Sequence, residues 1–266
     1  MAFPAGIVKE SAEGPMNAKV RSIYRYPVKG LSPESLPAVR LEPGQTLPAD
    51  RKYAIENGPS GFDPAAPAYL PKTRFLMLMK NERLAELETR YEDASHTLVI
   101  HGKGRELARG DLSTREGRLA IEAFFRRFMP SELHGPPKVL QADRHSFSDV
   151  SAKVVSIINL ASVAAIETMV GAPVHPLRFR ANLYVDGWPA WHEFDLVGEE
   201  VSIGNARLKV TKRIKRCAAI DVDPDTGMRD LEVLTTLMRT FGHADCGVYA
   251  HVAEGGEIAP GDIINP

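Results

Sequence analysis

Short strand-like segments outnumber the helical ones in this chain, and they limit the folds it can adopt. The segments are rich in Val, Ile and Tyr, and turns with Gly, Pro, Asp or Asn separate most of them, as is typical of strands joined by tight turns. These segments lie within residues 18–30, 38–47, 51–58, 96–102, 154–158, 181–187, 199–214, 218–223, 247–252 and 261–265. No regular βαβ alternation is present. We therefore predict a mainly β chain of the α+β class, with a closed or strongly curved mixed-sheet barrel and peripheral helices.

Three other segments have the periodicity of helices. The clearest is STREGRLAIEAFFRRFM at 113–129, where Ser113 or Thr114 can cap the first turn and the apolar residues form one stripe. It is predicted to be the hinge between two parts of the chain. Two further helices are expected at 160–171 and 231–242. The stretch 73–101 is ambiguous, because its first part fits a helix whereas residues 96–102 alternate like a strand. The proline-rich stretch 58–72 is expected to be a loop.

Composition limits the functional classes that need to be considered. The 266 residues carry a net charge of −1, so only a local cluster of charge can point to a charged ligand. Two cysteines argue against a disulfide framework and for a reducing compartment, which we expect to be the cytoplasm. No apolar run reaches the ~20 residues of a membrane helix, and we expect no membrane contact. The first fifteen residues are expected to form a loose arm without a signal peptide.

Cys217 ends the most basic stretch of the chain. Between Val201 and Ile220 there is no acidic residue, and the cations are Arg207, Lys209, Lys212, Arg213, Lys215 and Arg216. If residues 207–217 form one strand, Arg213, Lys215 and Cys217 lie on the same face. Neighbouring positive charge favours a thiolate, which is a nucleophile and a soft metal ligand. A solvated basic strand that ends in a buried cysteine explains the same pattern equally well.

Other candidate residues occur where predicted strands begin or end. Lys29, Arg51, Arg178, Arg180 and Asn182 lie at such positions, and the arginines suit phosphate because a guanidinium binds two oxygens at once. By contrast, we expect Cys246 to contribute to packing. Asp221 and Asp223 are expected to shape the turn that they flank.

Several familiar catalytic signatures are missing. The sequence contains no Walker loop, H-E-x-x-H, G-x-S-x-G or C-x-x-C motif, and the histidines lack the spacing of a zinc site. The basic stretch also lacks the interleaved aromatic residues on which nucleic-acid bases stack, so we expect no nucleic-acid partner.

A set of motifs, in the same order along the chain, resembles the MOSC family in its two-part form. That form has an N-terminal β-barrel domain and includes the mitochondrial amidoxime reducing component and bacterial relatives. The motifs are YPVKG at 26–30, DR at 50–51, RFRANLYVDG at 178–187, LVGEEVSIGNARLKV at 196–210, RCAAIDVDPDTG at 216–227 and GGEIAPGDII at 255–264. The resemblance implies a MOSC N-terminal β-barrel domain at 17–125 and a MOSC β-barrel domain at 126–266.

The resemblance further implies a molybdenum cofactor (Mo-molybdopterin) between the two domains. Cys217 would be the catalytic residue and the metal ligand. Cofactor contacts would fall on Lys29, Arg51, Lys72, Asn159, Arg178, Arg180, Asn182, Lys215, Arg216 and Tyr249. Lys72 is included because this chain has Lys72-Thr73 where relatives often carry TQR. The family as a whole is also associated with pyridoxal phosphate binding.

Two functions are compatible with this resemblance. The first is an oxidoreductase that reduces N-hydroxylated or N-oxide compounds. With only two cysteines there is no ferredoxin domain in the chain, so the electrons would come from a separate ferredoxin-like or cytochrome b5-like protein with its reductase. The alternative is a non-catalytic carrier of the molybdenum cofactor or of persulfide sulfur on Cys217.

Overall fold

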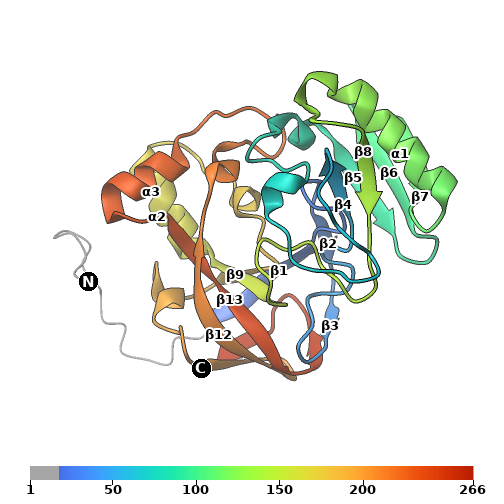
Figure 1. Ribbon diagram of the computed structural model, residues 1–266. Helices are drawn as coiled ribbons and strands as arrows, with labels where there is room; N and C mark the ends of the chain where they lie inside the picture. The colour runs from blue at the N-terminus through green and yellow to red at the C-terminus, as the bar shows by residue number, and fades with distance from the viewer. Residues whose placement is uncertain (1–17, 266) are drawn as a thin grey trace.

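A closed seven-stranded β-barrel forms the larger part of the computed structural model, which describes residues 18–265 (Figure 1). The barrel strands, in order of pairing, are β1 (Ala18–Arg25), β10 (Leu183–Asp186), β9 (Val155–Asn159), β13 (Asp245–Glu254), β12 (Ala206–Lys215), β11 (Glu200–Ile203) and β15 (Ile263–Asn265). The β1–β10 pairing closes the barrel. The mainly β fold class is thereby confirmed. The predicted N-terminal arm lies outside the described residues.

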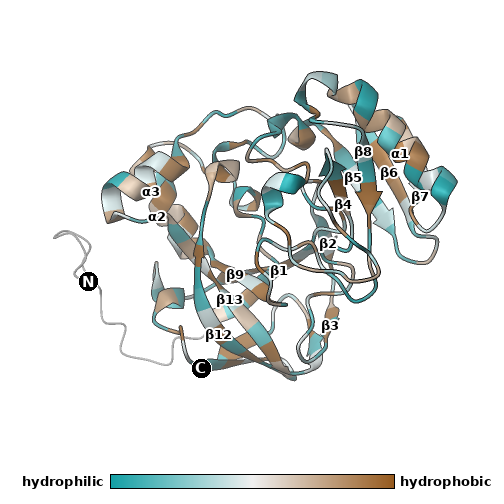
Figure 2. Ribbon diagram, viewed as in Figure 1, coloured by the Kyte–Doolittle hydropathy of each residue, from teal (hydrophilic) through white to brown (hydrophobic). Residues whose placement is uncertain are grey.

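Alternation of apolar and polar residues explains why these strands enclose a core. Along β1, buried residues alternate with exposed or half-buried ones, as expected for a strand with one face against the barrel interior. Figure 2 shows apolar and polar bands along the barrel strands. Val20, Ile157, Leu183, Leu208 and Val248 belong to the resulting core, and each is nearly inaccessible to solvent.

Helix α2 (Leu160–Val170) accounts for the parallel pair in the barrel. It connects β9 to β10, which run parallel, and parallel neighbours require such a crossover. The Asn159 side chain caps its N-terminus, and Gly171 ends it in the left-handed conformation. Helix α3 (Val233–Phe241) lies beside α2 (Figure 1). No helix among residues 18–265 has the length and apolar character needed to cross a membrane.

The N-terminal segment packs on the other side of the molecule (Figure 1). Its helix α1 (Arg115–Phe128) is capped by Thr114, which accepts a hydrogen bond from the Gly117 amide, and it buries Phe124 and Phe125. The remaining strands are β2 (Glu34–Leu36), β3 (Val39–Leu41), β4 (Ala54–Asn57), β5 (Glu88–Glu92), β6 (Thr97–Gly102), β7 (Arg105–Asp111), β8 (Pro137–Leu140) and β14 (Gly256–Ile258). β5, β6 and β7 form one sheet. The stretch from residue 73, for which the sequence allowed either helix or strand, contains two short 3₁₀ helices followed by β5.

Strands cross between the two parts of the chain. β1 comes from the N-terminal part but closes the C-terminal barrel, and β8 comes after α1 but pairs with β4. A second apolar core under α1 likewise includes Val222 from the C-terminal part. Sheet pairing and shared packing therefore fix the positions of the two parts relative to each other.

Candidate functional site

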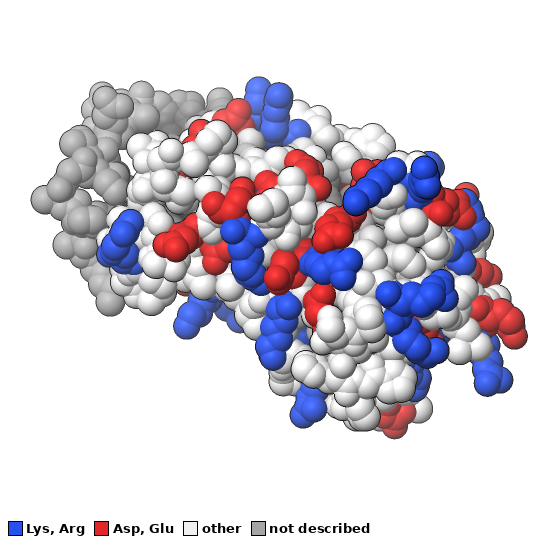
Figure 3. Space-filling view, turned by 90° about the horizontal axis from the view of Figure 1, so that it is seen from above, with Lys and Arg blue, Asp and Glu red and all other residues white. Residues whose placement is uncertain are grey.

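A cavity of about 480 Å³ lies where the barrel meets the N-terminal segment. Nine cationic side chains line it, whereas the carboxylates in its lining are those of Asp50 and Asp149. The cations are Lys29, Arg51, Lys72, Arg178, Arg180, Lys212, Arg213, Lys215 and Arg216. On the face seen in Figure 3, by contrast, basic and acidic side chains are interspersed. The concentration of positive charge at the cavity is thus a local feature of a chain with a net charge of −1.

Cys217 lies in the wall of this cavity, next to an ammonium group. β12 ends at Lys215, so the strand alternation predicted through residue 217 stops before the cysteine; Cys217 instead begins a 3₁₀ helix at Ala218–Asp221. The Lys72 Nζ donates to Cys217 Sγ at 3.2 Å. Lys72 is the last residue of the proline-rich stretch and begins a 3₁₀ helix at Lys72–Arg74, whereas residues 58–71 form a loop as predicted. The cation next to the sulfur therefore comes from the N-terminal segment, and the sulfur comes from the barrel.

Asp149 connects Lys72 to a second lysine. Its Oδ1 lies 2.5 Å from Lys29 Nζ, and its Oδ2 lies 3.2 Å from Lys72 Nζ. Burial opposes ionisation of Asp149, but the two ammonium groups outweigh it and hold the pKa of this carboxyl well below its usual range. Burial lowers the pKa of Lys29 despite the neighbouring Asp149, whereas Asp149 and Cys217 raise the pKa of Lys72 against its own burial.

Arg51 and Arg180 pack against the same tyrosine, one from each part of the chain. Their guanidinium carbons lie 4.4 and 4.3 Å from the centre of the Tyr26 ring, a distance at which cations are attracted to an aromatic ring. Both arginines have φ of 51°, a left-handed conformation that costs a non-glycine residue roughly 1–2 kcal/mol. Non-glycine residues held in this region cluster at functional sites.

Arg178 and Arg216 are held by the barrel itself. Arg178 donates to the Asp221 carbonyl and to the carboxylates of Asp223 and Asp230. The Asp223 carboxylate also accepts hydrogen bonds from the amides of 225 and 226, so it shapes the turn as predicted. Arg216 donates to the Cys246 and Phe179 carbonyls at 2.7 Å each.

One N–H group on each of these two arginines is buried and lacks an acceptor among residues 18–265. These groups are Arg178 Nε and Arg216 Nη2. Unpaired buried donors are costly, and they are commonly satisfied by water or by a ligand. Gly247 also lies against Arg216, because a Cβ at this glycine would come within 2.9 Å of Arg216 Nη2. Gly247 therefore leaves the space that the Arg216 guanidinium occupies.

The other predicted residues differ in how they relate to the cavity. Asn182 lines it, but its side-chain amide is engaged with Ser156 and the Tyr24 carbonyl. Lys215 lines it and is exposed, and Tyr249 lies in its wall, where burial raises the pKa of the phenol. Asn159 is not in the lining. Its side chain caps α2 and donates to Glu193 and to a backbone carbonyl.

Sequence reasoning missed Asp149 and did not assign Lys212 or Arg213 to the site. Asp149 belongs to the stretch 141–154, which has no helix or strand, and a single acidic residue in such a loop carries no local signal. Lys212 and Arg213 belong to the basic stretch that was identified, and the strand register brings them to the cavity. The other thiol, Cys246, is fully buried as predicted, and burial holds its pKa above the ordinary range.

A β-barrel with a cation-lined cavity and a thiol in its wall has the charge needed to hold an anionic ligand next to a sulfur. Two family models match the chain: the MOSC domain over residues 133–265, which is half of the chain, and the MOSC N-terminal beta barrel domain over residues 17–127. The chain belongs to the MOSC family.

Relatives of known name match shorter stretches. Mitochondrial amidoxime reducing component 2 of Bos taurus is 29% identical over 122 residues, which cover 41% of this chain and 36% of that protein. Molybdenum cofactor sulfurase of Drosophila willistoni is 33% identical over 106 residues, which cover 40% of this chain and 13% of that protein. Each match thus spans only about a third of its relative or less. Among solved structures, the YUAD protein from Bacillus subtilis aligns over 94% of this chain and 96% of its own, with a TM-score of 0.44 and 13% identity.

Both curated relatives are named for the molybdenum cofactor or for an amidoxime substrate, and the MOSC family is associated with molybdenum cofactor binding. Among residues 18–265, no group of three or more His, Cys, Asp or Glu side chains is arranged to hold a metal ion.

Proposed function

We propose that this chain is a molybdenum cofactor-binding oxidoreductase in which Cys217 ligates molybdenum. The observation that carries the proposal is the position of Cys217 Sγ in the wall of a strongly cationic cavity, 3.2 Å from the Lys72 ammonium. Thiolate is a suitable soft ligand for molybdenum. The relative named as an amidoxime reducing component supports the choice of reaction.

The residues that line the cavity fit such a cofactor. The pterin carries a phosphate, and arginine and lysine side chains are well suited to bind phosphate. Nine such side chains line the cavity. Its volume of about 480 Å³ lies within the usual range for small-molecule sites. When bound, the cofactor would supply the two-electron chemistry that removes oxygen from an N-hydroxylated or N-oxide substrate.

Different residues have different tasks in this proposal. Lys29, Arg51, Arg180, Lys215 and Arg216 bind the anionic parts of the cofactor. Lys72 keeps positive charge next to the ligating sulfur. Arg178 and Asn182 act through their hydrogen bonds to the turn at 221–230 and to the neighbouring strands, so they position the wall. Asn159 has no cofactor contact in this proposal, because it is engaged at the start of α2.

Electrons come from a separate protein in this proposal, either a ferredoxin-like or a cytochrome b5-like donor with its reductase. Cys217 and Cys246 are both free, which agrees with work in a reducing compartment such as the cytoplasm.

Molybdenum content tests the site directly. The protein would be purified from a host that makes the cofactor, and molybdenum would be measured in wild type, Cys217→Ala and Cys246→Ala. We expect equimolar metal in the wild type, none in Cys217→Ala and a normal amount in Cys246→Ala, because Cys246 is buried away from the cavity. Reduction of an amidoxime with an artificial electron donor should follow the same order. Metal-free wild type that also fails to bind the cofactor in reconstitution would refute the proposal.

A second candidate is a carrier of persulfide sulfur on Cys217. The observation that favours it is the similarity to molybdenum cofactor sulfurase, which covers 40% of this chain. Incubation with a cysteine desulfurase followed by mass spectrometry distinguishes the two. A persulfide on Cys217 in a protein that loads the cofactor but does not turn over would favour the carrier.

A further inference from the structure

The two carboxylates in the cavity wall are held in different ways. Asp50 is 3% exposed; one of its oxygens accepts from the Tyr26 amide, and the other pairs with Arg51. The Asp149 side chain is 45% exposed, and among residues 18–265 its carboxylate pairs with Lys29 and Lys72. A backbone amide fixes Asp50, whereas only flexible lysine side chains hold the Asp149 carboxylate.

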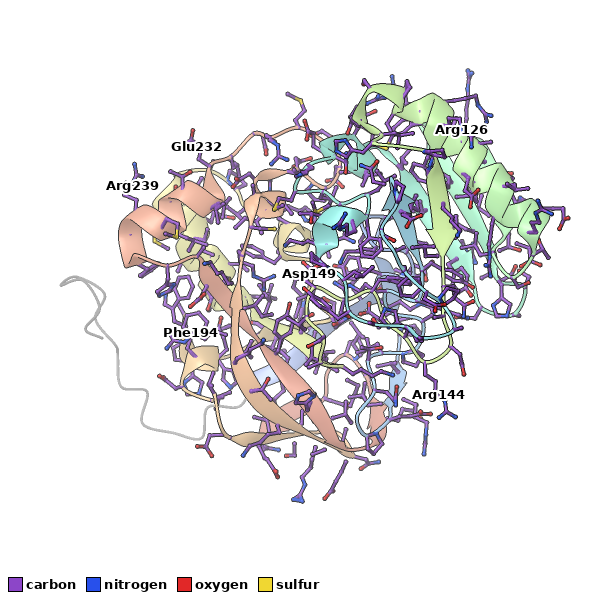
Figure 4. All side chains as sticks on the ribbon, in the orientation of Figure 1. Arg126, Arg144, Asp149, Phe194, Glu232 and Arg239 are labelled. Carbon is purple, nitrogen blue, oxygen red and sulfur yellow. The ribbon has the colours of Figure 1, made fainter. Side chains whose placement is uncertain are left out.

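The segment that carries Asp149 is free of regular structure. Residues 141–154 connect β8 to β9 without a helix or strand, and the Asp149 carbonyl accepts a hydrogen bond from the exposed Tyr69. Figure 4 shows Asp149 near the middle of the molecule, whereas Arg144 from the same segment lies at the periphery. A carboxylate on such a segment can leave its position at a smaller cost than one fixed within a sheet.

We infer that Asp149 is an internal competitor for the anion site, which makes the cavity selective for a large anionic ligand over free phosphate. Its carboxylate occupies the space between two ammonium groups, which is a position that an external phosphate oxygen would otherwise take. A small anion must therefore displace Asp149 or lie next to it, and both are unfavourable. A ligand that also gains sulfur and pterin contacts can meet that cost. The identity of this ligand rests on the proposed function, but the competition itself does not.

Asp149 also explains how Lys29 stays charged when no ligand is present. The Lys29 side chain is 7% exposed, and a buried ammonium without a counter-charge is strongly unfavourable. Asp149 supplies that counter-charge, together with the Phe147 carbonyl at 2.8 Å. The same carboxylate thus keeps the site cationic in the free protein and opposes weak anions. Adding an unfavourable element against the wrong ligand is a common way to achieve specificity.

Binding of inorganic phosphate to cofactor-free protein tests this inference. Wild type, Asp149→Asn and Asp143→Asn would be titrated by calorimetry at constant ionic strength. Asn retains an acceptor for Lys29 but removes the charge, and Asp143 is an exposed residue of the same segment that does not line the cavity. We expect Asp149→Asn to bind phosphate at least about tenfold more tightly than wild type, and Asp143→Asn to agree with wild type within about twofold. Equal or weaker binding by Asp149→Asn would overturn the inference.

Hydrogen exchange of the wild type provides a second measurement that does not depend on a variant. A saturating concentration of phosphate should increase amide exchange at residues 147–150 if Asp149 is displaced, and unchanged or slower exchange there would count against the inference. Failure of the proposed function would be seen separately, as wild type without molybdenum. The phosphate result would still stand in that case, because it uses protein without the cofactor.

Discussion

The two walls of the cavity hold their cations by different means. On the N-terminal wall, Lys29 and Lys72 are paired with Asp149, a carboxylate that itself lines the cavity. On the barrel wall, Arg180 and Arg216 donate to backbone carbonyls, and the carboxylates that pair with Arg178, those of Asp223 and Asp230, do not line the cavity. A carbonyl in a folded chain cannot be replaced by a ligand, but a carboxylate on a loop can. The barrel wall is therefore a fixed template, and the N-terminal wall is the side that can adjust.

The largest effect that tests this difference is on stability. Arg216→Ala would leave the Phe179 and Cys246 carbonyls without their donor, and we expect the free energy of unfolding to fall by about 3 kcal/mol. Lys72→Met should cost less than about 1 kcal/mol, because its ion pair is partly exposed. Urea unfolding of the cofactor-free proteins measures both values.

Arg213→Ala is the matched control for the arginine substitution. Arg213 lies three residues before Arg216, within β12, and is exposed, with its guanidinium over the Phe194 ring. Its loss should cost less than about 1 kcal/mol. Equal losses for Arg213→Ala, Arg216→Ala and Lys72→Met would show that the two walls do not differ.

The same difference explains what could be predicted from the sequence. The barrel, the helix at 115–128 with its Thr114 cap and the basic strand that leads to Cys217 follow from local patterns. The pairing of β1 across the barrel does not, because closure depends on contacts between residues far apart in the chain. Asp149 could not be recognised for a similar reason: its meaning arises only when the folded chain brings Lys29 and Lys72 to it.

Asn159 has a structural role that the family resemblance did not suggest. The family resemblance suggested a cofactor contact, but the residue lies at the junction of β9 and α2, where an asparagine satisfies unpaired amides of the helix N-terminus. A cap signal was present in the sequence, since Asn159 directly precedes the predicted helix. That local signal predicts the capping role that Asn159 has in the structure.

A pH titration probes the adjustable wall. The Asp149 carboxyl has a lowered pKa in the folded chain, so its ionised form stabilises the fold at pH values above the unfolded pKa of about 3.9. This contribution is lost as the pH falls through the folded pKa. We expect wild type to be more stable than Asp149→Asn at pH 6, with a difference in melting temperature that shrinks steadily as the pH is lowered from about 5 to about 2. A constant difference over this range would mean that the Lys29–Asp149–Lys72 contacts do not depend on charge.

The smallest expected effect concerns the rim of the barrel wall. Lys215 is exposed and lines the cavity, whereas Arg207 near the other end of β12 lies outside the lining and pairs with Glu254 at 2.7 Å. Replacement of either residue by Gln should change the free energy of unfolding by less than about 0.5 kcal/mol, because both are solvated.

The two rim variants should differ only in anion binding. Lys215→Gln should weaken phosphate binding by a factor of about three, as expected when one exposed, screened charge near an anion is lost, and Arg207→Gln should leave it unchanged. Calorimetric titrations at two ionic strengths provide the measurement, and the effect should diminish at the higher salt concentration. Equal weakening by both variants would mean that the overall positive charge of β12 attracts the anion, and not Lys215 in particular. A selective effect of Lys215→Gln would instead show that the fixed wall extends to the end of this strand, next to Cys217.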